Sequence, residues 1–127
     1  MIRECIPPLT RAGISQADAE ALRRIAMTLH RWHELECGSD RGCIERDETT
    51  GKPYWLSAIT GKRAGVVPDR ETAAKKRLAK IMARYPTLRA YIQGDPRGAS
   101  LYILRPGDVP EGAEVDSYYS RGLAVYK

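Results

Sequence analysis

The feature that most constrains the fold is a stretch of helical periodicity close to the N-terminus. Its apolar side chains recur at spacings of three and four residues, at Leu22, Ile25, Leu29 and Trp32. Arg23, Arg24 and Arg31 fall largely on other faces of the same segment. The pattern predicts an amphipathic helix.

Signals at both ends set the bounds of this helix. The Ser15 hydroxyl can accept a hydrogen bond from a free backbone N–H of the first turn, and Asp18 places negative charge at the positive end of the helix dipole. Gly38 can take positive φ without a Cβ penalty, which is typical of the residue that ends a helix. We therefore expect the helix over about residues 16–37.

Three segments after this helix favour β structure. Residues 43–47 and 52–57 flank the turn-rich run 48–51, and Thr60-Gly61-Lys62 repeats the turn signal before Val66-Val67. These segments predict a small three-stranded meander.

A second helix and a hairpin are predicted after Pro68. Asp69 can cap the helix, which we expect to continue through Tyr85 with an apolar face made of Ala74, Leu78, Ile81 and Tyr85. Residues 88–93 and 100–105 alternate as strands do, and the run 94–98 between them is rich in turn residues. Residues 115–119 and 123–126 are compatible with short strands or an oligomer contact.

These elements predict a single α+β domain over residues 1–127: a long N-terminal helix, a three-stranded meander, a second helix and a C-terminal antiparallel hairpin or sheet. Residues 1–14 are expected to be an irregular N-terminal arm. The first helix should pack its apolar stripe on the C-terminal sheet. Phe is absent, and seven Tyr and two Trp supply all of the aromatic area. Because large aliphatic side chains are few, Tyr and Trp burial against another subunit would supplement the core, and we expect a homo-oligomer.

Charge and cysteine content bear on partners and compartment. The net charge of +5 at pH 7 favours an anionic partner. The first eight residues contain no apolar leader, and three cysteines form an odd set, which together predict a cytoplasmic protein. Apolar runs are far shorter than the roughly 20 residues that cross a bilayer, so no membrane partner is expected.

The densest chemistry lies at the end of the first predicted helix. His33 and Cys37 are four residues apart and share a helix face, with Cys43 close by in sequence, so these three are an alternative zinc site. A straight helix spreads His30, His33 and Cys37 over a wide arc, and the paired Cys-x2-Cys spacing of zinc modules is missing. Buried cysteines and a hydrogen-bonded His33 are therefore the expected interpretation, with no cofactor.

Catalytic signals are weak. Cys37 lies near a helix C-terminus, whose partial negative charge opposes a thiolate, and Glu34 and Glu36 point to different helix faces. Neither a P-loop nor a Gly-x-Gly-x2-Gly string occurs. We expect the protein not to be an enzyme.

The predicted hairpin tip suggests a ligand site. Small residues there let backbone amides approach an anion, and Arg97 can bind a phosphate through two hydrogen bonds while tyrosines on the flanking strands stack on a base. The ligand residues expected are Arg97, Asp95, Tyr91, Tyr102, Arg105, Trp32 and His33. An ordinary surface turn with a solvated Arg97 is the alternative.

The second predicted helix carries a basic face. Its cations are Lys75, Lys76, Arg77, Lys80 and Arg84, with Glu71 as the internal counter-charge. Lys75, Lys76, Lys80 and Arg84 are the expected contacts if the protein binds nucleic acid or an acidic partner instead. A solvated face is the alternative.

Five motifs carry a resemblance: Thr28–Gly38, Gly42–Asp47, Thr50–Trp55, Gly94–Gly98 and Leu101–Asp108. Across about residues 22–126 the chain resembles an uncharacterised family of small bacteriophage and prophage proteins. The resemblance implies a protein of the host-cell cytoplasm, and by analogy an anti-defence protein. The leading hypothesis is a non-enzymatic protein that sequesters a nucleotide immune signal. A basic module that blocks a host defence complex and a small zinc-binding module are the alternatives.

Overall fold

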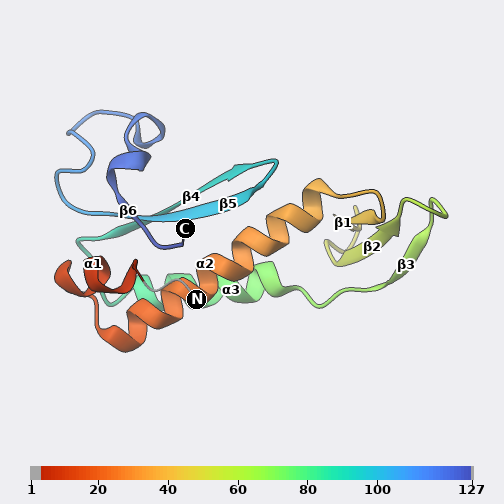
Figure 1. The fold of residues 1–127 in the computed structure, drawn as a ribbon, viewed down its shortest axis with the longest axis horizontal. Helices are drawn as coiled ribbons and strands as arrows, with labels where there is room; N and C mark the ends of the chain where they lie inside the picture. Colours follow the sequence, from red (N-terminus) through yellow and green to blue (C-terminus); the bar gives the residue numbers. More distant parts are fainter. Residues whose placement is uncertain (1–3, 127) are drawn as a thin grey trace.

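The long helix α2, Gln16–Cys37, forms the spine of the molecule (Figure 1). The computed structural model describes residues 4–126. Both predicted ends of α2 are confirmed: the Ser15 hydroxyl accepts a hydrogen bond from the Asp18 amide at 3.2 Å, and Gly38 has φ of 88°. One end of α2 lies among helices and a sheet, and the other end leads into a second sheet (Figure 1).

The sheet beyond the C-terminal end of α2 is the predicted meander. It is antiparallel in the order β1-β2-β3, with strands Gly42–Arg46, Pro53–Ser57 and Arg63–Val66. The last strand begins three residues before the Val66 expected from sequence, and all four of its residues are exposed. The sheet contacts α2 through β1, whose buried apolar residue Ile44 lines the same depression as Trp32 and Leu35 of α2.

The second sheet is built on the predicted hairpin. Strands β4, Arg89–Asp95, and β5, Gly98–Leu104, pair antiparallel, and the short strand β6, Leu123–Ala124, adds to the free edge of β5. Helix α3, Arg70–Met82, is capped by Asp69, whose carboxylate accepts from the Thr72 amide at 3.1 Å. The α+β fold class and the element order match the sequence expectation.

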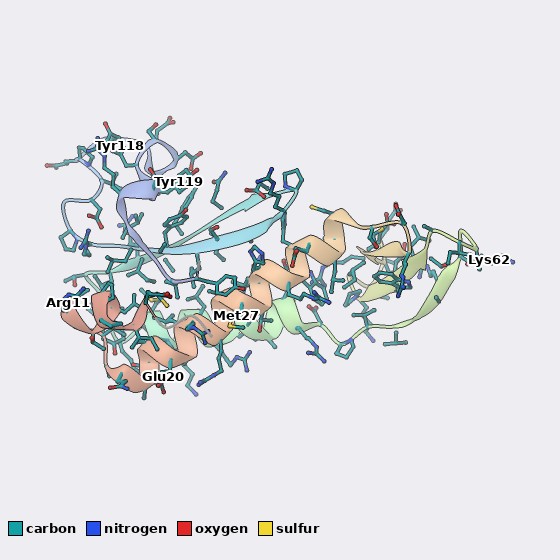
Figure 2. The ribbon with its side chains drawn as sticks, in the orientation of Figure 1. Arg11, Glu20, Met27, Lys62, Tyr118 and Tyr119 are labelled. Carbon is teal, nitrogen blue, oxygen red and sulfur yellow. The ribbon has the colours of Figure 1, made fainter. Side chains whose placement is uncertain are left out.

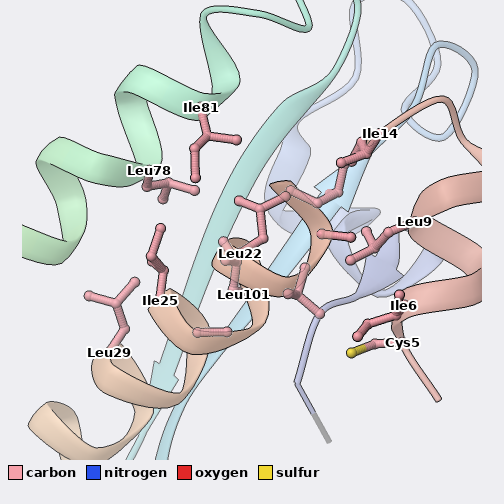
Figure 3. Close-up of a cluster of buried hydrophobic side chains, with 14 of the residues drawn as sticks. Cys5, Ile6, Leu9, Ile14, Leu22, Ile25, Leu29, Leu78, Ile81 and Leu101 are labelled. Carbon is pink, nitrogen blue, oxygen red and sulfur yellow. The ribbon is translucent and has the colours of Figure 1, made fainter. Parts of the chain in front are cut away.

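The core lies where α2 packs on β5 and α3 (Figure 3). Leu78 and Ile81 of α3 face Ile25 of α2, while Leu22 of α2 lies close to Leu101 of β5 (Figure 3). Leu22 and Leu101 are each no more than 1% exposed. The predicted packing of α2 on the C-terminal sheet is confirmed, because α2 contacts β5 and Leu22 lies close to Leu101 (Figure 3). Ile25 and Leu29 belong to the same buried cluster, in which Ile25 faces α3 (Figure 3).

Two segments differ from the sequence expectation. Part of the predicted irregular arm is helix α1, Ile6–Arg11, whose Pro7 and Pro8 lie in the first turn, where amides have no intrahelical partner to lose. Residues 115–119 are not a strand: they contain one 3-10 turn, Val115–Ser117, and begin a second, Tyr119–Arg121. These turns fold over the sheet through Tyr119, which contacts Tyr91 and Tyr102.

The second predicted helix ends earlier than expected, at Met82 instead of Tyr85. The Tyr85 hydroxyl instead reaches α2 and donates to the Asp18 carboxylate at 2.6 Å. None of the helices within residues 4–126 combines the length and apolar character that a membrane crossing requires.

Candidate functional site

The histidines at the end of α2 support the β4–β5 hairpin. His30 donates from Nδ1 to the Ala99 carbonyl oxygen at 2.8 Å and lies edge-on to Tyr126, with ring centroids 5.3 Å apart. The hairpin backbone comes so close that a Cβ on Gly94 would lie 2.8 Å from His33 Cε1, and a Cβ on Gly98 would overlap the His30 ring. The rings of His30 and His33 therefore pack directly against the hairpin backbone at Gly98 and Gly94.

The proposed zinc ligands point to different partners. Cys37 Sγ lies 4.0 Å from the Asp95 carbonyl oxygen, and Cys43 Sγ lies 4.0 Å from Glu45 Oε2. Cys37 is exposed and Cys43 is half-buried, so the expectation that both thiols are buried is wrong: they lie at the end of α2 and the start of β1, outside the core. Within residues 4–126, no group of three or more His, Cys, Asp or Glu side chains is placed to hold a metal ion. The zinc alternative on His33, Cys37 and Cys43 stays a prediction.

The predicted nucleotide-binding residues lie in separate places. Asp95 and Arg97 form the hairpin tip beside the last turns of α2, where Asp95 Oδ1 accepts from the Arg97 amide at 2.7 Å. Tyr91 and Tyr102 are register partners further along the strands. Trp32 is 3% exposed and has Arg46 over its ring at 5.6 Å.

Several of these groups already have partners within the chain. Tyr91 stacks on Tyr119 with ring centroids 5.4 Å apart and donates to Asp116 at 2.6 Å, a hydrogen bond that raises the pKa of Tyr91. Arg105 donates from Nε and Nη2 to its neighbour Asp108, each at 3.1 Å. A single chain thus brings together Asp95, Arg97 and His33, but not the tyrosines, Arg105 or Trp32.

The basic face predicted on the second helix is divided by the structure. Lys75 lies 3.8 Å from Glu71, and Arg84 donates to Asp18 at 2.6 Å, so these two cations have acidic partners. Lys76 and Lys80 are exposed, and neither has an ion pair with another residue in the range 4–126.

A groove between α2 and α3 brings Lys80, one of the predicted contacts, together with four arginines that were not predicted as contacts. The two helices run antiparallel, because the start of α2 meets the end of α3 through Asp18 and Arg84. A depression of about 300 Å³ lies between them, lined by Ala21, Arg24, Ile25, Thr28, Arg77, Lys80 and Ile81. Beyond Thr28 it adjoins a second depression of about 330 Å³, lined by Met27, Thr28, Arg31, Trp32, Leu35, Ile44, Val67 and Arg70. Figure 2 labels Met27, which lines the second depression, midway along α2.

We call the five cations of these two depressions the groove cations: Arg24, Arg31, Arg70, Arg77 and Lys80. All five are exposed, and none forms an ion pair with another residue of the described range 4–126. The residues that line the two depressions include no Asp or Glu. The groove is therefore a positively charged surface with contributions from both helices.

Acidic residues that lie near the two ends of α3 bind arginines that are not groove cations. Arg46 donates to both Asp69 oxygens at 2.9 Å and to Glu71 at 3.1 Å, which holds the pKa of Asp69 well below its usual range. Tyr85 and Arg84 bind Asp18 and lower its pKa, although its burial acts in the opposite direction. The lowered pKa values keep Asp18 and Asp69 ionised at neutral pH. Within residues 4–126, neither these two residues nor Glu71 forms an ion pair with a groove cation.

Comparison of the chain with protein-family models, with curated proteins and with solved structures gives no match. The resemblance to phage proteins and the anti-defence role it implies stay predictions. The candidate site therefore rests on the geometry of the α2–α3 groove.

Proposed function

We propose that this protein binds nucleic acid and that the α2–α3 groove holds the phosphate backbone. One observation carries the proposal: five exposed cations from two helices line one groove, with no acidic residue in its lining and no ion pair to them within residues 4–126. Phosphate neutralisation by Lys and Arg supplies most of the affinity of such contacts.

The spacing of the groove cations supports an extended anion over a small one. Arg24 and Arg31 are seven residues apart on α2, and Arg70 and Arg77 are seven apart on α3, so each pair spans about 10 Å along its helix. Two rows of charge at this spacing can contact several phosphates of one chain at once. A mononucleotide has too few phosphates to reach them all.

Like charges facing one another across a groove oppose folding when they have no counter-ion. Arg24 lines the same depression as Arg77 and Lys80, and Arg31 lines the same depression as Arg70. A bound polyanion would relieve this repulsion, so binding is expected to stabilise the fold.

The nucleotide-sequestering function predicted from Arg97 and its neighbours is less favoured, because several of its expected ligand residues are not free to bind. Tyr91 and Arg105 already hold Asp116 and Asp108, and Trp32 is buried against Arg46. A second subunit would have to complete a pocket at the hairpin tip. That function stays a prediction, as does the expectation that the protein is not an enzyme.

Fluorescence anisotropy with labelled single-stranded and duplex oligonucleotides tests the proposal. The variant Arg77→Glu/Lys80→Glu reverses two groove cations at exposed positions of α3 and should abolish binding. The control Lys52→Glu/Lys62→Glu makes the same change in net charge at exposed positions around the β1-β2-β3 sheet, which we call the distal sheet, and should bind almost normally. Equal losses in both variants, or no binding by the natural chain, would refute the proposal.

An acidic protein surface is the competing partner for a basic groove. Labelled poly-glutamate, tested in the same assay, carries similar charge without phosphates or bases. Binding of poly-glutamate as tight as that of the oligonucleotides would overturn the assignment to nucleic acid.

A further inference from the structure

One end of the α2–α3 groove differs in character from the rest. The depression of about 330 Å³ has mainly apolar walls, formed by Met27, Trp32, Leu35, Ile44 and Val67. Its two cations are Arg31, from α2, and Arg70, from the first turn of α3. We call it the apolar pocket.

The apolar pocket is open to solvent. Met27 is 39% exposed, and Leu35 and Val67 are half-buried, although Trp32 and Ile44 beneath them are nearly inaccessible. Its volume is at the lower end of the range of pockets that hold small organic ligands. The pocket therefore offers apolar contact area to a group of limited size.

Its position restricts the occupant. The pocket adjoins the basic depression at Thr28, which lines both, so a group held there is continuous with an anion held by Arg24, Arg77 and Lys80. A planar apolar group joined to a chain of phosphates is the chemical description of a nucleotide within a strand. Arginine guanidinium planes also stack on nucleobases, which suits Arg31 and Arg70.

We infer that the apolar pocket receives an unstacked base of a single-stranded nucleic acid whose phosphates follow the groove cations. This inference rests on the proposed function and adds the class of strand to it. In a duplex the bases are paired and stacked, and taking one out of the stack is costly. The protein therefore prefers single strands to duplexes of the same length.

Three probes of equal length, about 12 nucleotides, separate the base contribution from the phosphate contribution. They are oligothymidylate, a strand of the same backbone with abasic sites throughout, and a duplex. At one salt concentration the natural chain should bind oligothymidylate about tenfold more tightly than the abasic strand, which is the scale of one base contact. The duplex should also bind more weakly than oligothymidylate.

Two variants place this preference in the pocket. Met27→Ser shortens an exposed wall of the apolar pocket and should reduce the affinity for oligothymidylate to that for the abasic strand, with the abasic strand unaffected. The matched control is Ile59→Ser, which removes a side chain that is 82% exposed in the turn between β2 and β3 and should change neither affinity.

The outcomes distinguish base binding in the apolar pocket from phosphate binding in the groove. Binding that depends on Arg77 and Lys80 but is equal for oligothymidylate, the abasic strand and the duplex overturns the inference and leaves the proposed function standing. Loss of oligothymidylate preference in Ile59→Ser to the same degree as in Met27→Ser also overturns it. Absence of binding to every probe overturns both.

Discussion

At the scale of single residues, Asp18 connects the start of α2 to the chain after α3. Its carboxylate accepts from the Tyr85 hydroxyl and from Arg84, each at 2.6 Å, although the residue is only 9% exposed. The sequence suggested a simpler role for Asp18, as a negative charge at the helix dipole. The partners of Asp18 lie more than 60 residues away in sequence, and local signals cannot identify them.

Asp18→Asn should lower the free energy of unfolding at neutral pH by about 2 kcal/mol, because two hydrogen bonds to a charged acceptor are weakened. The folded-state pKa of Asp18 lies below its unfolded value. Its stabilising contribution is therefore present above about pH 4 and is lost as the pH falls through the folded-state pKa. Urea unfolding at several pH values should show a smaller acid-induced loss in the variant than in the natural chain. Equal acid sensitivity would contradict this role.

The hairpin glycines also have a role that depends on residues distant in sequence. Gly98 has φ of 145° and packs against the His30 ring, which is itself held by the Ala99 carbonyl oxygen. Composition alone marked the segment as a turn and a possible ligand site. The helix surface that it contacts depends on tertiary packing, so the role of His30 and His33 as its support could not be read from the sequence.

Gly98→Ala should destabilise the fold by about 3 kcal/mol, since it adds a steric overlap to an unfavourable backbone conformation. Gly112→Ala is the control: Gly112 has φ of 78°, and no heavy atom of the described chain lies within 4 Å of the position that a Cβ would take, so the cost should be about 1 kcal/mol, from backbone strain alone. Thermal unfolding measures both. A loss in Gly98→Ala no larger than in the control would show that the contact with His30 is loose.

At the scale of elements, local sequence signals located most helices and strands, and long-range contacts explain the exceptions. The bounds of α2 follow from Ser15, the apolar period and Gly38, all of which act within a few residues. Helix α1 was not predicted because two adjacent prolines, Pro7 and Pro8, are typical of irregular chain. The turns after residue 115 were not predicted because their conformation depends on contacts with the sheet that they cover. Tertiary contacts of this kind produce no recognisable pattern in the local sequence.

The distal sheet depends on one such long-range contact. Arg46 of β1 lies over Trp32 of α2 and binds Asp69 and Glu71 at the start of α3. These side chains are about one-third exposed or less, so the ion pairs are only partly screened by solvent. Arg46 thus joins β1 to both long helices.

Arg46→Ala should lower the free energy of unfolding by about 1 to 2 kcal/mol, because two carboxylates lose charge-assisted hydrogen bonds. Amide hydrogen exchange should accelerate in β1–β3 and remain slow in β4 and β5. Arg63→Ala, at an exposed ion pair with Asp47, serves as the control and should leave the rest of the fold unchanged. Uniform acceleration across both sheets would contradict a local role for Arg46.

At the scale of the whole molecule, the candidate site arises from the antiparallel packing of α2 and α3. The basic character of α3 was visible in the sequence, but Lys75 and Arg84 have acidic partners in the structure. Arg24, Arg31 and Arg70 join the site only because two distant segments lie side by side. The expected homo-oligomer also depends on the surface of the whole molecule, and it stays a prediction.

The salt dependence of oligonucleotide binding tests the central claim most directly. The logarithm of the association constant should fall linearly with the logarithm of salt concentration, with a slope near 0.7 to 0.9 per phosphate contact, or about 3.5 to 4.5 for five groove cations. The measurement compares the natural chain with Arg77→Glu, which should have a shallower slope, and with Lys52→Glu, which should have the natural one. A slope close to zero, or the same slope in all three proteins, would contradict backbone binding in the α2–α3 groove.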